Sequence, residues 1–415
     1  MVVQEILEVF YAPHRAFKKI VNNPKFLAPI IVVIMLIVLQ VGSAYIVGTK
    51  SHVEQTIPTS QQGDGWTENA ALWQASPGVT ITNNHFDYIN SSNFYYNTTS
   101  IEFTAENASS IQIFLTNFGE SVNCGLDGFK NLSIRAKIDS LTSIPDNVTL
   151  YLFSLSPANF FAYDLTQAFS NTTIAEQHLW NNITVQVGSD DWIISNSAAS
   201  WETITGLRID FTWPSSSNLN LRVDGLFFRG IFKGELEIDA TGFIIGAALN
   251  SATPFLIQWL LLTALMYLVI KMLKGNVVWK PLMVAVGVAM VTLIVQTIVF
   301  IAVYAAILPE INSPLELIAR IPGEGNAALS VIQNTLAPLY NVAFYVQIAI
   351  WAWIFVLGIF ITRAVTGMAP PRPADLTQAE TEGPVSYPQF NWSKCMMVSF
   401  ASVVIRVLIL LFVGI

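Results

Sequence analysis

Five apolar runs constrain this sequence more than any other feature. They cover residues 26–47, 251–270, 281–308, 336–361 and 395–415. A helix needs about 20 apolar residues to cross the hydrocarbon core of a bilayer. The first run is too long for a signal-peptide core and lacks a small-residue cleavage site, so it predicts an uncleaved anchor. We therefore expect a bundle of five transmembrane helices, with the lipid bilayer as its first partner.

Charge divides the chain into two kinds of segment. Only 12% of its residues are charged, whereas a soluble chain carries about a quarter. Residues 50–239 hold 20 Asp and Glu against 8 Lys and Arg, and the remaining residues hold 8 against 12. This distribution predicts an acidic soluble block inside an apolar, slightly basic frame. Because phosphate repels an acidic surface, we expect no nucleic-acid partner.

The short loops assign a side of the membrane to each segment, because loops rich in Lys and Arg stay in the cytoplasm. Basic residues gather in residues 1–25, after the second run and after the fourth run: Arg15, Lys18, Lys19, Lys25, Lys271, Lys274, Lys280, Arg363, Arg372 and Lys394. The loop after the third run holds three glutamates and one arginine. We therefore expect a multi-pass plasma-membrane protein. Its N-terminus is cytoplasmic, residues 48–240 are extracellular, and its C-terminus reaches the outer face.

Residues 1–25 read as a cytoplasmic amphipathic segment. Four apolar residues share one helical face, and three basic residues share another after Pro13. They are Val3, Ile6, Leu7 and Phe10, and Arg15, Lys18 and Lys19. We expect a helix lying in the inner headgroup layer, with a helix that docks on a partner as the alternative.

Residues 60–235 read as β structure. Apolar and polar residues alternate along 131–138 and 207–213, which is typical of strands with one buried face. Turn residues separate about ten such segments. We predict an extracellular all-β jelly-roll sandwich, and residues 240–415 then supply transmembrane helices two to five.

Acceptor triplets for N-linked sugar concentrate in the acidic block. Seven lie there, at Asn90, Asn97, Asn107, Asn131, Asn147, Asn171 and Asn182. An eighth, at Asn391, falls in the basic loop before the last apolar run. Because sugar transfer occurs on the outer face, we expect glycan on several of the seven and none on Asn391.

The stretch from Trp201 to Gly230 resembles the last two strands of galactose-binding-like and carbohydrate-binding jelly rolls. Trp201 opens the penultimate strand, and Asp224-Gly225 interrupts the final one. The resemblance implies the fold, with glycan binding by analogy. Exposed rings would suit a sugar site, whereas buried rings would form the core; the six tryptophans are Trp66, Trp73, Trp180, Trp192, Trp201 and Trp213. Asp190, Asp191 and Asp224 are either calcium ligands or solvated turn residues.

The membrane frame resembles the YIP family of small five-span proteins. The resemblance depends on Phe10, Pro13 and Phe17 before the first apolar run, on the short Lys-Gly turn at 271–280, and on the last two runs. The departure is the large inserted domain. Eukaryotic members of the family are linked to vesicle traffic and Rab-type GTPases. A glycosylated outer domain without disulfides implies an archaeal plasma membrane instead, where the GTPase role is not expected.

No catalytic, cofactor-binding or metal-ligating pattern emerges, so we expect no enzyme and no cofactor. The sequence has no zinc-protease helix, nucleophile elbow or P-loop, and its four histidines are isolated. Cys124 and Cys395 fall on opposite sides of the membrane, so we predict no disulfide.

Arg406 is the one charged residue deep in an apolar run. Its charge costs at least about 2.5 kcal/mol there, and no Asp or Glu lies in any of the five runs. We expect it to face the bundle interior or a partner. Its potential partners are Gln258, Gln296, Asn341, Gln347, backbone carbonyls, lipid phosphate and another chain.

These features predict a YIP-like, non-enzymatic protein of membrane organisation or the envelope. It would display a glycosylated β-sandwich outside the cell. One alternative is a surface receptor or adhesin that binds glycans or envelope proteins. Another is an accessory subunit of a larger membrane complex or transporter, with other membrane subunits as partners.

Overall fold

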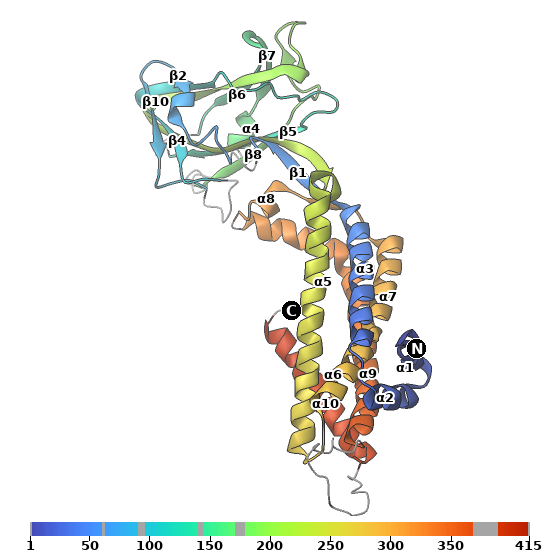
Figure 1. Ribbon diagram of the computed structural model, residues 1–415. Helices are drawn as coiled ribbons and strands as arrows, with labels where there is room; N and C mark the ends of the chain where they lie inside the picture. The colour runs from blue at the N-terminus through green and yellow to red at the C-terminus, as the bar shows by residue number, and fades with distance from the viewer. Residues whose placement is uncertain are drawn as a thin grey trace, which may run out of the picture. The chain divides into compact units, whose positions relative to one another are not determined.

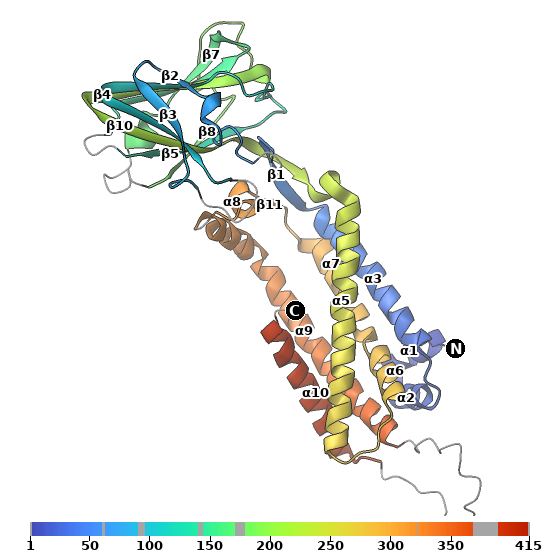
Figure 2. The same cartoon turned by 60° about the vertical axis from the view of Figure 1, so that its left-hand side comes forward.

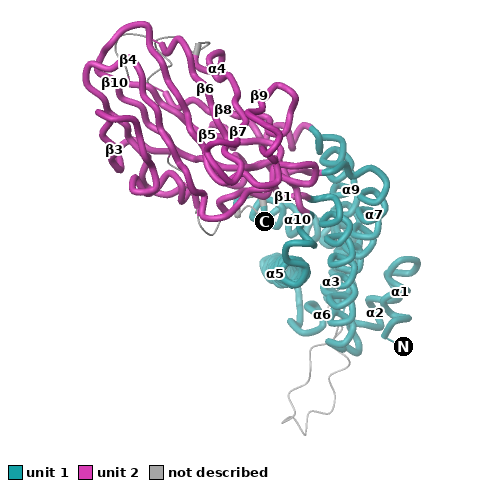
Figure 3. The backbone as a smooth tube through the Cα atoms, turned by 90° about the horizontal axis from the view of Figure 1, so that it is seen from above, with its two compact units in different colours: residues 1–51, 234–310, 335–415 teal, residues 52–233, 311–334 magenta. Residues whose placement is uncertain are grey.

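The computed structural model describes residues 2–59, 63–89, 96–139, 144–170, 179–321, 323–367 and 389–413. The chain forms two compact units (Figure 3). The helical unit holds residues 1–51, 234–310 and 335–415. The β-sandwich unit holds residues 52–233 and 311–334. Its bounds differ from the expected 60–235, because it begins earlier and includes a loop that is distant in sequence.

Five long apolar helices dominate the helical unit (Figures 1 and 2). They are α3 (Leu27–Gly48), α5 (Glu235–Met272), α6 (Trp279–Ala289) continued by α7 (Val291–Ile307), α9 (Glu324–Thr366), and α10 (Trp392–Val413). Each is long and apolar enough to cross a membrane, with α6 and α7 counted together. The predicted set of long apolar helices is confirmed, and their insertion in a bilayer stays a prediction. α5 and α9 begin well before the predicted apolar runs. The runs do not include the first turns of these helices, because those turns carry acidic residues.

Two short helices precede α3: α1 (Val2–Tyr11) and α2 (Pro13–Asn22). Glu8 of α1 and Lys19 of α2 form an ion pair of 2.7 Å. Ile6 of α1 is buried, whereas Val3 and Leu7 are exposed. The single apolar face expected from the sequence is therefore divided, with one edge packed on the protein and the other open to the surroundings.

In the part of the chain that the structure describes, the β-sandwich unit consists of β-strands with short helices between them. Its elements are β1 (Ser51–Ile57), β2 (Gln74–Ala75), β3 (Val79–Asn84), β4 (Ser100–Leu115), β5 (Asn131–Ile138), β6 (Asn147–Ser154), β7 (Ser156–Asp164), α4 (Thr166–Ser170), β8 (Asn181–Gln186), β9 (Ile193–Ile194), β10 (Ile204–Gly234), β11 (Ile311–Ser313) and α8 (Leu315–Ile318). This confirms the predicted β-sandwich.

Two long strands, β4 and β10, contribute to both layers. The first half of β10 pairs with β6 and with the second half of β4, and β6 continues to β7 and β9. The second half of β10 pairs with β5 and with the first half of β4, which also pairs with β3. Strand β10 covers the stretch that the sequence indicated as the last two strands. The Asp224-Gly225 interruption is present as a register shift, and Gly225 has a φ of +53° beside the Tyr96 ring, where a side chain would collide.

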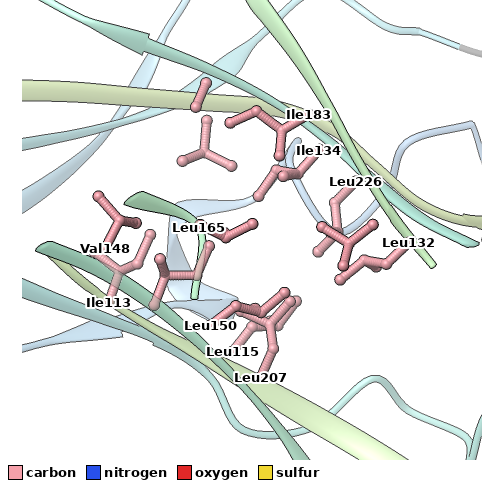
Figure 4. Packing of buried hydrophobic residues seen from close by; sticks show 14 of the residues in the cluster. Ile113, Leu115, Leu132, Ile134, Val148, Leu150, Leu165, Ile183, Leu207 and Leu226 are labelled. Carbon is pink, nitrogen blue, oxygen red and sulfur yellow. The ribbon is translucent and has the colours of Figure 1, made fainter. Parts of the chain in front are cut away.

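Apolar residues from the two layers fill the space between them (Figure 4). Ile113, Leu150 and Leu207 of one layer face Ile134 and Ile183 of the other. Burial of each such side chain contributes about 1.5–3 kcal/mol. Four of the six tryptophans are also buried, at positions 66, 73, 192 and 213. These four rings therefore belong to the core, which is one of the two alternatives that the sequence left open.

Candidate functional site

A ladder of opposite charges covers the outer face of one layer. Strand register places Arg222 of β10 between Glu102 of β4 and Lys137 of β5. The Arg222 Nε donates to Glu102 at 2.8 Å, its Nη1 contacts Asp87, and Lys137 contacts Asp87 at 2.7 Å. Burial alone would raise the pKa of Asp87, but Lys137 and Arg222 hold it below its ordinary value. Asp87 thus stays ionised, and all four side chains are paired.

A groove of about 710 Å³ continues this face beyond the charge ladder. Its lining is polar and includes Thr80, Thr104, Asp139, Asn218 and Asn220. The Trp180 Nε1 donates to Asp87 of the ladder at 3.2 Å. The next residue to Asp87, Phe86, is 98% exposed. The groove therefore offers hydrogen-bonding groups, and the Trp180 ring is bonded to the ladder.

Three carboxylates of the β-sandwich unit meet at one point. Oxygen atoms of Asp64, Glu68 and Asp224 lie within 4.8 Å of one another, and Asp64 and Asp224 are fully buried. The Asp224 carboxylate accepts bonds from the Ile89 and Gly225 amides at 2.6 and 2.7 Å. Burial raises the pKa of Asp64 to about 6 and also raises that of Asp224, so a proton shared between them satisfies the pair. Hard cations also take such ligands, so these residues could hold a metal ion.

The buried Glu54 carboxylate ties three distant segments together. It accepts from Arg229 at 2.9 and 2.8 Å, from the Gly230 amide at 2.9 Å and from the Leu315 amide at 2.7 Å. Arg229 also donates to Glu316 at 2.9 Å. Burial would lower the pKa of Arg229, but Glu316 and Glu54 raise it, so the guanidinium stays charged. Strands β1 and β10 and the loop after α7 are held at one point.

A second ion pair joins the same loop to the sheet. Arg135 of β5 donates from Nη1 and Nη2 to both oxygens of Glu324, at 2.6 and 2.7 Å. Arg135 is buried, although strand alternation placed it on an outer face. The segment 311–334 covers it and supplies its counter-charge.

The predicted site residues are distributed as follows. Asn97, Asn107, Asn147 and Asn182 are exposed and Asn131 is half-buried, whereas Asn90 and Asn171 lie outside the described residues. Asp190 and Asp191 are exposed and do not join Asp224. Cys124 and Cys395 are free and buried. Arg406 is 1% exposed and donates to Gln258, one of its expected partners.

Sequence reasoning missed Asp64, Glu68, Glu54, Glu316 and Glu324. The acidic loop residues at 316 and 324 served only to assign a side of the membrane. Their second role depends on a fold that brings them to β5 and β10. An arginine at an alternating outer position of a strand was the available signal, because it needs either solvent or a partner.

No family model matches the chain, and no curated protein matches it. One solved structure of carbohydrate-binding modules from the β-sandwich superfamily matches with 12% identity and a TM-score of 0.26. That match covers 38% of this chain and 57% of that chain. A family 11 carbohydrate-binding module from Clostridium thermocellum, in complex with a β-1,3-1,4-mixed-linked tetrasaccharide, has 10% identity and a TM-score of 0.27. It covers 42% of this chain and 94% of that one. Likeness at this level does not decide what this β-sandwich binds.

Replacing Glu54 by alanine should destabilise the β-sandwich unit by about 3–5 kcal/mol, because it leaves a buried guanidinium partly unpaired. Urea unfolding of the full chain in detergent, followed by near-ultraviolet circular dichroism, measures the change. Glu120→Ala, at an exposed turn glutamate, is the control and should change stability by less than about 0.5 kcal/mol. Equal effects of the two substitutions would contradict this role for Glu54.

The Asp64–Asp224 pair should make stability fall as pH rises. The ordinary carboxyl pKa is 3.8, whereas that of folded Asp64 is about 6. Between these values the folded state binds more protons than the unfolded state, so the free energy of unfolding decreases with increasing pH. Melting of the β-sandwich unit in a chelator, from pH 4 to pH 7, measures the slope.

Asp64→Asn should flatten that slope, whereas Asp190→Asn, at an exposed aspartate, should leave it unchanged. Adding calcium at pH 7 tests whether the three carboxylates bind a metal ion. A cation that binds the three carboxylates restores the melting temperature lost between pH 4 and pH 7. An unchanged slope in Asp64→Asn would show that the pair does not titrate as described.

Proposed function

We propose that this chain is a five-span, YIP-like, non-enzymatic membrane protein that holds a glycosylated jelly-roll domain outside the cell. Its role would lie in the envelope or in membrane organisation. One observation carries the proposal. The segment 311–334, which runs from the loop after α7 into the first turns of α9, belongs to the same compact unit as residues 52–233, between α3 and α5.

Two long apolar helices separate these segments in the chain: α5, and α6 with α7. If each of them crosses the bilayer once, the chain returns to its starting side, and the loop can reach the β-sandwich. A single crossing would place the two segments on opposite sides. The ion pairs of Arg229 and Arg135 with loop glutamates therefore support the alternating topology. The positions of Lys and Arg then place the shared side outside.

Labelling of single-cysteine variants on intact cells tests this topology. Both native cysteines are buried, and they are replaced by alanine. A membrane-impermeant maleimide should label Asp190→Cys on intact cells, and Lys274→Cys only after permeabilisation. Mass spectrometry of the native protein gives a second readout, with sugar at several of the exposed upstream asparagines and none at Asn391. Labelling of the two cysteines in the reverse order would invert the topology.

The outer face of the sheet favours a second function, glycan binding. The groove beside the charge ladder is large and lined by hydroxyl, amide and carboxylate groups, which suit sugar hydroxyls. Trp180 is bonded to the ladder at Asp87, and the exposed Phe86 is the residue before Asp87 in the chain. Sugar rings stack on such aromatic side chains. A glycan-binding receptor or adhesin would use this face.

A printed glycan array probed with the full chain in detergent tests this second function. Replacing Asn220 by alanine removes a groove amide and its 2.9 Å bond to Glu102. We expect the signal for any bound glycan to fall about tenfold or more, because a buried polar contact to the ligand is lost. Gln186→Ala, at an exposed strand residue away from the groove, should keep the wild-type signal. A wild-type chain that binds no glycan would exclude the receptor function.

A further inference from the structure

The apolar helical unit contains a polar cavity of about 210 Å³. Residues of α3, α5, α7 and α9 line it. Four of the lining side chains are glutamines: Gln40, Gln258, Gln296 and Gln347. No carboxylate is among the lining residues. Burying polar groups in an apolar bundle costs free energy unless they are hydrogen-bonded. The presence of four glutamines around one cavity therefore needs an explanation.

Arg406 of α10 fixes the orientation of one of these amides. A guanidinium has donors and no acceptor, so Gln258 must turn its Oε1 toward the Nη2 of Arg406. The Nε2 of Gln258 is then a donor for which the described residues supply no acceptor. Two other amides are bonded to each other, with Gln296 Nε2 donating to Gln347 Oε1 at 2.6 Å. Gln40 donates to Thr297 at 2.9 Å.

The charge of Arg406 has no counter-charge among the described residues. The side chain is 1% exposed, and its Nε and Nη1 have no hydrogen-bond partner there. By contrast, Arg229 and Arg135 in the β-sandwich unit each meet a carboxylate through two bonds. A buried cation with one neutral acceptor is strongly disfavoured. An anion nearby would remove that cost.

We propose that this cavity binds a small monovalent anion of the carboxylate or halide class. Gln258 donates to the anion directly, and Arg406 supplies the positive charge and holds the amide in place. At roughly 30 Å³ for each water-sized molecule the cavity accommodates acetate or chloride with its water, and it is too small for a lipid headgroup with its chains. The inference rests on the helical unit alone and is independent of the ligand of the β-sandwich.

Saturation-transfer NMR with ¹³C-labelled acetate tests the proposal on the full chain in an uncharged detergent. Acetate should bind saturably, and acetamide, which has a similar shape and no charge, should not. Chloride is the second arm: competition with acetate assigns the site to monovalent anions in general, and absence of competition restricts it to carboxylates. Either result of this arm supports the site.

Two substitutions separate the site from general packing. Gln258→Leu removes the donor and should weaken acetate binding about tenfold or more. Gln258→Glu places a carboxylate beside Arg406, so acetate binding should disappear while the melting temperature rises. This second variant keeps the test valid if the first one folds poorly. Thr263→Val is the control on the same helix, because its hydroxyl bonds only to the Trp259 carbonyl of its own helix and does not line the cavity.

Three results would overturn the proposal: equal binding of acetate and acetamide, wild-type binding in Gln258→Leu, or no saturable binding by the wild-type chain. The last result is also expected if an acidic group of a second copy or another chain neutralises Arg406. In that case Gln258→Glu would release the bound chain, and size-exclusion chromatography would report the change.

Discussion

The buried carboxylate of Glu54 is the interaction on which the β-sandwich unit depends most. A carboxylate that is 3% exposed is stable only when its acceptor capacity is filled. Two backbone amides and two guanidinium nitrogens fill it, and they come from β10 and from the start of α8. Separating β1 from the C-terminal part of β10 and from the loop after α7 would therefore leave buried charges unpaired. This costs several kcal/mol of folding free energy.

This dependence explains why the compact unit differs from the contiguous domain that the sequence indicates. Residues 60–235 contain Arg229 and Arg135, but their carboxylate partners Glu54, Glu316 and Glu324 lie outside that range. A fragment with these bounds would lack the counter-charges of both guanidinium groups. The β-sandwich unit is thus completed by residues 52–59 and 311–334, which supply the counter-charges of both arginines.

The sequence predicted the regular elements well, because each follows from a local pattern. Alternation indicated β5 and β10, and uninterrupted apolar runs indicated α3 and α7. The ion pairs of Arg229 and Arg135 were not predictable, because they join residues more than 80 positions apart, as with Arg229 and Glu316. Alternation also assigned Arg135 to a solvated face, since a two-residue period does not reveal whether another segment covers that face. In α1 the 3.6-residue period identified apolar positions, yet which edge packs on the protein depends on α2 and α3.

The burial of the tryptophan rings limits what the outer face can recognise. Four tryptophans that could have stacked on sugar rings are committed to the core, and their burial stabilises the sandwich by about 1.5–3 kcal/mol each. Recognition on the described face must then rely on hydroxyl and amide groups, on charges that are already paired within the ladder, and on Phe86 and Trp180. Contacts of this kind give little net free energy each, because every one replaces a bond to water. A glycan bound there would be held weakly by one copy, so useful affinity would come from many copies displayed on one membrane engaging one polymer.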